Sequence, residues 1–158
     1  MRIRAARAAD AEEGSTLLWR SIEDLCRADH GDDPARIAAW TANKTAAMWL
    51  AWLDQADIRL FVAVDERRIL GVGMIRTDGH IMLNYVLPEA RFQGVSKAMI
   101  ARLEAEATKL GSECCTLETS ETARRFYLGA GYAPAPDGGA AMRKPLGPLD
   151  SAQEGDGG

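Results

Sequence analysis

The stretch of residues 85–100, YVLPEARFQGVSKAMI, holds residue types that can bind an anion. It begins as an apolar strand, passes through a proline and continues as a helix whose first turn contains Gly94, Ser96 and Lys97. The first N–H groups of a helix lack partners within the helix, and the helix dipole adds partial positive charge there. Gly94 lets a ligand approach the backbone, and Arg91 and Lys97 can form charge-assisted hydrogen bonds. This pattern can hold a pyrophosphate, and taken alone it also fits an ordinary helix N-terminus with a surface arginine and lysine.

Two better-known phosphate loops do not fit the sequence. A P-loop requires GxxxxGK[ST], whereas GVSK at residues 94–97 lacks the second glycine and the spacing. A dinucleotide fingerprint requires GxGxxG at the start of a helix, whereas GVGMIR at residues 71–76 lies within a strand pattern. Both nucleotide motifs are therefore excluded.

The cysteines do not form a recognisable site. The chain has three, Cys26, Cys114 and Cys115, and none belongs to a CxxC motif or a Cys/His cluster with metal-ligand spacing. We expect reduced, buried thiols and no metal site.

The N-terminal third must supply helices around the predicted site. Residues 2–6 alternate like an edge strand, and Asp10 with Glu13 fits a capping box that opens a helix ending near His30. Asp33 before a proline predicts a second helix, and AAMWLAWL at residues 46–53 a third. All four tryptophans lie in this part, where they either pack in the core or line an acceptor pocket: Trp19, Trp40, Trp49 and Trp52.

The remaining chain predicts a sheet. Three apolar, β-rich runs at residues 58–66, 68–77 and 80–87 are separated by short turns, which is typical of an antiparallel meander. A helix then runs to about Leu110, followed by a strand over 113–119, a short helix over 121–131 and a hairpin over 131–144. The sequence predicts a mixed α+β domain.

Composition limits the classes of protein. The 158 residues suit one domain, with 47% apolar and 27% charged residues as in soluble globular proteins. We expect no membrane span and no secretion signal, and hence a cytoplasmic protein. Residues 146–158 hold three of the acids and no base, which leaves a net charge of −1 for residues 1–145. We predict a domain at 1–145, a disordered acidic tail at 146–158 and no nucleic-acid partner.

Two motifs resemble those of the GNAT superfamily of N-acetyltransferases, in its single-domain bacterial form. VLPEARFQGVSKAMI is similar to the acetyl-CoA motif, a V-x-P strand end followed by [QR]-x-x-G-x-[GA], matched at Arg91 and Gly94, with Ser96 in place of the usual glycine or alanine. LETSETARRFYLGAGY is similar to the strand and final helix of the family, with Ser120 in place of the common asparagine. That second motif matches at Ala123, Phe126, Tyr127, Gly131 and Tyr132. The resemblance covers roughly residues 1 to 144.

The resemblance implies a fold and a cosubstrate. We expect a mixed, mostly antiparallel sheet flanked by helices, with central strands that splay apart into a cleft for acetyl-CoA. The implied cofactor-binding residues are Tyr85, Val86 and Leu87 for pantetheine and the thioester carbonyl, Arg91, Phe92, Gln93, Gly94, Val95, Ser96 and Lys97 for pyrophosphate, and also Ser120 and Ala123. Backbone groups near residues 85–87 would stabilise the tetrahedral intermediate.

The resemblance also implies catalytic roles. Tyr127 matches the family tyrosine that protonates the departing thiolate. A base is needed for the amine, and the candidates are His80, Glu118 and His30.

We therefore predict an acetyl-CoA-dependent N-acetyltransferase in which a primary amine of a small molecule or peptide attacks the thioester directly. A catalytically silent acyl-CoA-binding or regulatory module of the same fold is the alternative. An acyltransferase of charged tRNA is a third possibility, disfavoured by the near-neutral body. A homodimer is possible.

Overall fold

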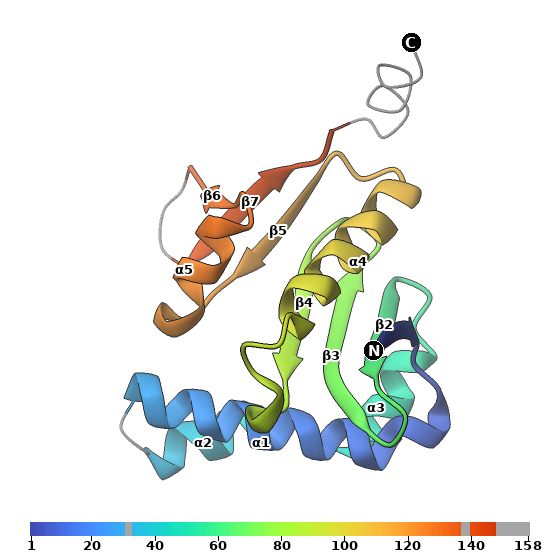
Figure 1. Cartoon of the computed structure of the whole chain (residues 1–158), viewed down its shortest axis with the longest axis vertical. Helices are drawn as coiled ribbons and strands as arrows, with labels where there is room; N and C mark the ends of the chain where they lie inside the picture. Colours follow the sequence, from blue (N-terminus) through green and yellow to red (C-terminus); the bar gives the residue numbers. More distant parts are fainter. Residues whose placement is uncertain (31–32, 137–139, 148–158) are drawn as a thin grey trace.

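The computed structural model describes residues 1–30, 33–136 and 140–147 as an α+β protein (Figure 1). The predicted fold class and order of elements are confirmed. The strands are β1 (Arg2–Ala5), β2 (Ile58–Val64), β3 (Ile69–Arg76), β4 (Ile81–Val86), β5 (Cys114–Glu118), β6 (Ala133–Pro134) and β7 (Ala141–Pro145). The helices are α1 (Ala11–His30), α2 (Pro34–Thr41), α3 (Ala46–Leu53), α4 (Val95–Lys109) and α5 (Glu121–Gly129), with 3₁₀ turns η1 (Ala8–Asp10) and η2 (Pro88–Ala90).

The strands form two antiparallel sheets. The larger has the order β1-β2-β3-β4, with β1 at its edge as residues 2–6 predict, and the smaller has the order β5-β7-β6. Each meander turn has a local cause: Asp65 Oδ1 accepts from the N–H groups of Arg67 and Arg68 between β2 and β3, and Gly79 adopts φ +93° before β4. The hairpin predicted for the last part of the chain is confirmed by the pairing of β6 with β7.

The two sheets meet at one point within the described part of the chain. His80 and Thr116 form an isolated parallel bridge, with the N–H of Thr116 donating to the carbonyl oxygen of Gly79 at 3.1 Å. Beyond this bridge, β4 pairs with β3 and β5 pairs with β7, and Figure 1 shows β4 and β5 diverging. The predicted splayed strands are therefore present.

The glycines of the GVG stretch in β3 allow α4 to pack closely on the larger sheet. A Cβ at Gly73 would lie 2.5 Å from Sδ of Met99, and one at Gly71 would lie 2.8 Å from the side chain of Val95. Val95, Met99 and Leu103 are buried along one stripe of α4, as predicted from their spacing. These glycines thus serve helix packing, which agrees with the exclusion of a dinucleotide motif.

The start of α1 differs from the predicted capping box. The Asp10 carboxylate accepts from the N–H of Arg7 at 2.8 Å, three residues earlier, and also binds the Arg4 guanidinium at 2.9 Å. Glu13 instead accepts from the N–H of Ile69 at 2.6 Å, which ties α1 to β3. The predicted pairing of Asp10 with Glu13 was wrong because each carboxylate has a stronger partner outside that turn.

The tryptophans divide between the core and the surface. Trp49 and Trp52 are buried, and the indole N–H of Trp49 donates to the carbonyl oxygen of Arg7 at 3.1 Å. Trp19 is 44% exposed, whereas Trp40 is half-buried beside the cleft described below. Core packing is therefore confirmed for Trp49 and Trp52, whereas a role of Trp40 in an acceptor pocket stays a prediction.

The expectations for the cysteines, a metal site, a membrane span and the C-terminal tail can be compared with the structure only in part. Cys114 and Cys115 are free thiols, and burial raises the pKa of Cys115 to about 11. No group of His, Cys, Asp and Glu side chains within residues 1–30, 33–136 and 140–147 could hold a metal. None of the helices in this part of the chain is long and apolar enough to span a membrane. Most of the predicted tail, residues 148–158, and the side chain of Cys26 lie outside the described residues.

Candidate active site

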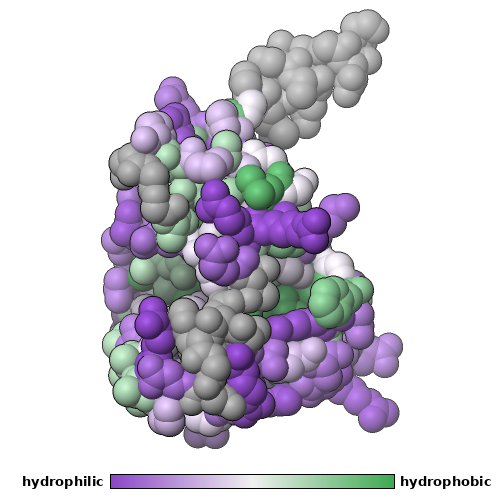
Figure 2. All heavy atoms as spheres, turned by 90° about the vertical axis from the view of Figure 1, so that its left-hand side faces the viewer, coloured by the Kyte–Doolittle hydropathy of each residue, from purple (hydrophilic) through white to green (hydrophobic). Residues whose placement is uncertain are grey.

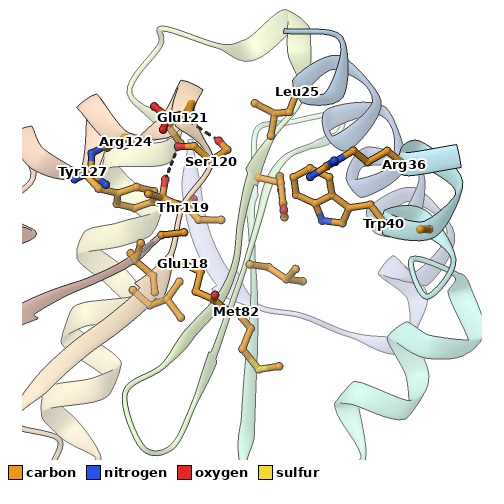
Figure 3. A pocket seen from close by; sticks show the side chains of 18 residues that line it. Leu25, Arg36, Trp40, Met82, Glu118, Thr119, Ser120, Glu121, Arg124 and Tyr127 are labelled. Carbon is orange, nitrogen blue, oxygen red and sulfur yellow. Dashed lines mark hydrogen bonds between the residues drawn. The ribbon is translucent and has the colours of Figure 1, made fainter. Parts of the chain in front are cut away.

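The diverging strands β4 and β5 enclose a cavity of about 800 Å³. Its two walls face each other in Figure 3, with α2 and α1 on one side and β5 and α5 on the other. Seen from the side of α5, hydrophilic residues surround a recess in which more hydrophobic ones are visible (Figure 2). The cavity is lined by Leu25, Arg36, Ala39, Trp40, Ile81, Met82, Leu83, Asn84, Tyr85, Leu117, Glu118, Thr119, Ser120, Glu121, Ala123, Arg124, Tyr127 and Ala140.

Tyr127 forms part of the α5 wall and is hydrogen-bonded across the cleft. Its side chain is buried, and its Oη accepts a hydrogen bond from Nδ2 of Asn84 on β4 at 3.1 Å. Burial raises the pKa of Tyr127, whereas the bond from Asn84 opposes that rise. The phenol is therefore protonated at neutral pH and can act as a proton donor.

The edge of β4 that faces β5 exposes backbone groups to the cavity. The N–H of Leu87 donates to the carbonyl oxygen of Leu70, so the peptide groups of Leu87 point toward β3. Because peptide groups alternate along a strand, those of Val86 point to the opposite edge, toward β5. Tyr85 lines the cavity, and Val86 and Leu87 are buried beside it. This edge can bind an extended ligand as a strand would.

The N-terminus of α4 lies directly after this edge. Helices α2, α3 and α5 begin with the side-chain caps Asp33, Thr45 and Ser120, each of which accepts from a backbone N–H. The N-cap of α4 is Gly94, which adopts φ +83° and provides no side-chain cap. A Cβ at Gly94 would meet no atom within 4 Å, so the space beside this residue is open.

The side chains around Gly94 have different surroundings. The Arg91 guanidinium lies 2.6 Å from the Asp24 carboxylate on α1, whereas Gln93 and Lys97 are exposed. Phe92 is also fully exposed and adopts φ +64°, an unusual conformation for a residue with a side chain. Val95 is buried under the helix, and Ser96 is half-buried in its first turn.

Comparison with known proteins identifies the fold. Residues 15–139 match the model of the family described as "Acetyltransferase (GNAT) domain". The chain belongs to the GNAT family of acetyltransferases. No curated protein sequence matches the chain.

Solved structures agree on the GNAT fold. A GCN5-related N-acetyltransferase from Rhodopseudomonas palustris has a TM-score of 0.81 and 24% identity, over 92% of this chain and 95% of that one. PaiA N-acetyltransferase from Thermoplasma acidophilum, solved with coenzyme A, has a TM-score of 0.82 and 17% identity, over 91% and 98%. The ribosomal-protein-S18-alanine N-acetyltransferase from Escherichia coli has a TM-score of 0.62 and 15% identity, over 92% and 93%.

The residues present fit the acyl-CoA that GNAT acetyltransferases use. Within the described residues, the edge of β4 that faces β5 forms no strand pairing past the His80–Thr116 bridge and suits an extended pantetheine arm, and the start of α4, which has no side-chain cap, suits a pyrophosphate. Ser120 has an additional structural role, since its Oγ accepts from the N–H of Ala123 at 3.2 Å while both residues line the cavity. Their predicted contact with the cofactor stays a prediction.

The base candidates lie at different places in this GNAT cleft. Glu118 lines the cavity at the end of β5 and is exposed. His80 lies at the closed end, where its Nδ1 is 2.8 Å from Oγ1 of Thr116, roughly 13 Å along β4 from Asn84 at 3.3 Å per residue. Burial lowers the pKa of His80, which favours its neutral form. The side chain of His30 lies outside the described residues.

Two further cavity residues, Asn84 and Arg36, were not predicted from the sequence, whereas Trp40 is one of the tryptophans expected either in the core or in an acceptor pocket. Asn84 is a polar residue within the apolar strand IMLNYV, and this interruption was the available signal. Arg36 and Trp40 are four residues apart on α2 and therefore share one face, which Figure 3 shows turned toward the cavity. Their spacing was visible in the sequence, but the side of α2 that faces β4 and β5 was not.

Proposed function

We propose that this protein is an acetyl-CoA-dependent N-acetyltransferase that acts on a primary amine. The observation that carries the proposal is Tyr127, a buried and protonated phenol that contacts Asn84 on β4 across an open cleft. A module that only bound acyl-CoA would need the edge of β4 and the start of α4 but not a proton donor between the strands. Tyr127 therefore favours catalysis over the silent alternative.

In the proposed reaction, backbone groups of residues 85–87 hold the pantetheine arm and polarise the thioester carbonyl. N–H groups at the start of α4 and the side chain of Lys97 hold the pyrophosphate. The amine nitrogen attacks the carbonyl carbon, the C–S bond breaks with its electron pair on sulfur, and Tyr127 gives that sulfur a proton. The products are an N-acetyl amide and free coenzyme A.

Glu118 is the base that we favour for removing the proton of the amine. Its carboxylate borders the cavity, whereas His80 needs a chain of water molecules to reach the same space. The variants Glu118→Gln and His80→Gln distinguish these two candidate bases. Only the variant that removes the true base should strongly lower kcat at neutral pH.

The cavity walls support an acceptor with one amine and an apolar or aromatic body. Leu25, Ala39 and Trp40 supply apolar surface, and Arg36 adds a cation for which the described part of the chain shows no carboxylate partner. The lining acids Glu118 and Glu121 are balanced by Arg36 and Arg124, which disfavours a polycationic acceptor. An acidic group on the acceptor, distant from its amine, would complement Arg36.

The test combines calorimetry with turnover. Acetyl-CoA is titrated into the folded protein, and thiol release is then followed with a panel of aryl- and alkylamines with and without a carboxylate, together with polyamines. Binding with turnover supports the enzyme. If acetyl-CoA binds but no thiol is released with any amine of the panel or with N-terminal peptides, the silent module is supported. If acetyl-CoA does not bind, its use by this protein is contradicted.

A further inference from the structure

Asn84 is a polar residue whose surroundings are not explained by the fold. It lies in β4 between Leu83 and Tyr85, in a strand that is otherwise apolar apart from the tyrosine hydroxyl. Its Nδ2 donates to Oη of Tyr127, whereas its Oδ1 is buried and has no hydrogen-bond partner among the described residues. A buried amide is expected to satisfy both of its polar atoms, and this one satisfies only the atom that faces Tyr127.

The direction of this hydrogen bond decides what the phenol can do. A tyrosine hydroxyl can accept one hydrogen bond and still donate its own hydrogen elsewhere. Because the amide NH₂ of Asn84 faces Oη, the hydrogen of Tyr127 is not used by Asn84. An amide or carboxylate oxygen at the same position would accept that hydrogen and keep it from a ligand.

Stability alone would favour a different residue at position 84. Leucine has a similar shape, would leave no unsatisfied oxygen, and suits a strand packed among apolar side chains. The asparagine therefore has a cost in the folded protein, and the contact that it gains is the one to Tyr127.

We propose that Asn84 is a positioning residue that fixes the phenol of Tyr127 so that its hydroxyl hydrogen is directed into the cleft, toward the sulfur of the acyl donor. This inference rests on the proposed acetyl transfer. As the C–S bond breaks, the hydrogen of Oη passes to sulfur, Asn84 donates to the phenolate that forms, and a proton released by the amine restores the phenol through solvent.

The test uses two variants of similar size. Asn84→Leu removes the donor and the unsatisfied oxygen, and Asn84→Asp replaces the donor with an acceptor. For Asn84→Leu we expect kcat to fall by about 10- to 100-fold, within the range for general acid catalysis, with an unchanged Kd for coenzyme A and no loss of thermal stability. For Asn84→Asp we expect a larger fall in kcat, because the carboxylate competes for the hydrogen of Tyr127.

A double-mutant cycle separates positioning from a structural role. In the Tyr127→Phe background, Asn84→Leu should cause no further fall in kcat, because both changes remove the same proton donation. If Asn84→Leu lowered kcat in the Tyr127→Phe background by the same factor as in the wild type, the proposal would be overturned. Normal kcat in Asn84→Leu, or a loss of kcat accompanied by an equal loss of coenzyme A affinity, would also overturn it.

The contact can also be tested without turnover. In protein labelled at tyrosine ¹³Cζ, the resonance that disappears in Tyr127→Phe is assigned to Tyr127. Its chemical shift should change in both Asn84 variants while the resonances of the other tyrosines stay in place, and an unchanged shift would overturn the proposal. If this contact is present but no amine or water accepts the acetyl group, the proposed function fails and the positioning role fails with it.

Discussion

The guanidinium of Arg91 lies 2.6 Å from the carboxylate of Asp24, so the arginine of the acetyl-CoA motif is paired with the first helix. The two side chains are 25% and 40% exposed. In the proposed site, a pyrophosphate that binds Arg91 would compete with Asp24 for this guanidinium.

Asp24→Asn should therefore tighten the binding of coenzyme A. Partly exposed ion pairs contribute about 0.2–1 kcal/mol, which corresponds to a gain in affinity of up to about fivefold. Isothermal titration calorimetry measures the effect. The matched control is Glu23→Gln, which removes a neighbouring acid of α1 that pairs with Arg27 rather than Arg91. Equal changes in both variants would indicate a general effect of charge instead.

Gly94→Trp should abolish or strongly weaken the binding of coenzyme A, because an indole would cover the N–H groups at the start of α4. Gly111→Trp is the control. Gly111 also has a positive φ, +90°, and free space around a Cβ, but it follows the other end of α4. Both variants carry similar backbone strain, of about 1–2 kcal/mol. Equal loss of binding in the two would contradict a site at Gly94.

Tyr127→Phe should lower kcat by about 10²- to 10⁴-fold while leaving the Kd for coenzyme A nearly unchanged. The reason is that the phenol contributes a proton late in the reaction rather than binding energy. Tyr132→Phe is the control and removes another hydroxyl of a buried tyrosine. The Tyr132 hydroxyl donates to the Glu104 carboxylate at 2.9 Å, and neither residue lines the cavity. That variant should lose stability instead of kcat. Rapid thiol release by Tyr127→Phe would refute the role of Tyr127.

Trp40→Ala and Arg36→Ala should raise KM for the acceptor amine without changing the Kd for coenzyme A. Arg36→Ala should affect acceptors with a carboxylate by about 10- to 100-fold more than their neutral analogues, since a charged hydrogen bond is worth about 1.5–3 kcal/mol. Trp19→Ala is the control, because Trp19 is an exposed tryptophan of α1 outside the cavity lining. Initial rates, measured while the concentrations of acetyl-CoA and of the acceptor amine are varied independently, separate the KM of the amine from the binding constant of the cosubstrate.

Asp10 should make stability depend on pH in the acid range. Its hydrogen bond from Arg4 lowers the pKa of Asp10 below its ordinary value of 3.8 in the folded protein. Its contribution is therefore complete above pH 3.8 and is lost as pH falls through the lower, folded pKa. Asp10→Asn should cost about 1–3 kcal/mol at pH 7 and flatten this dependence. Urea unfolding at several pH values measures both, and a parallel pH dependence in wild type and variant would argue against the assignment.

Local patterns in the sequence were sufficient for the order of the helices and strands, whereas the splayed sheet was predicted from the resemblance to the GNAT family. Alternation and turn residues predicted the meander, and the glycine, serine and lysine of residues 94–97 predicted the start of α4. What they could not give were contacts between distant segments. The partner of Arg91 is a residue of α1, the partner of Glu13 is a backbone N–H of β3, and the partner of Tyr127 is Asn84, all set by packing of the folded chain. Asn84 was missed because it belongs to neither family motif.

The single bridge between His80 and Thr116 has a consequence for assembly of the protein in the cell. Past that bridge, β4 and β5 form no strand pairing with each other in the described part of the chain, and such strand edges are protected in other proteins by charges, prolines or bulges. Here each edge is shielded from foreign strands mainly by the opposite wall of the cleft. If acyl-CoA binds between β4 and β5 as proposed, it lies where a further strand would pair, and a newly made chain that binds it early has fewer strand edges open to aggregation.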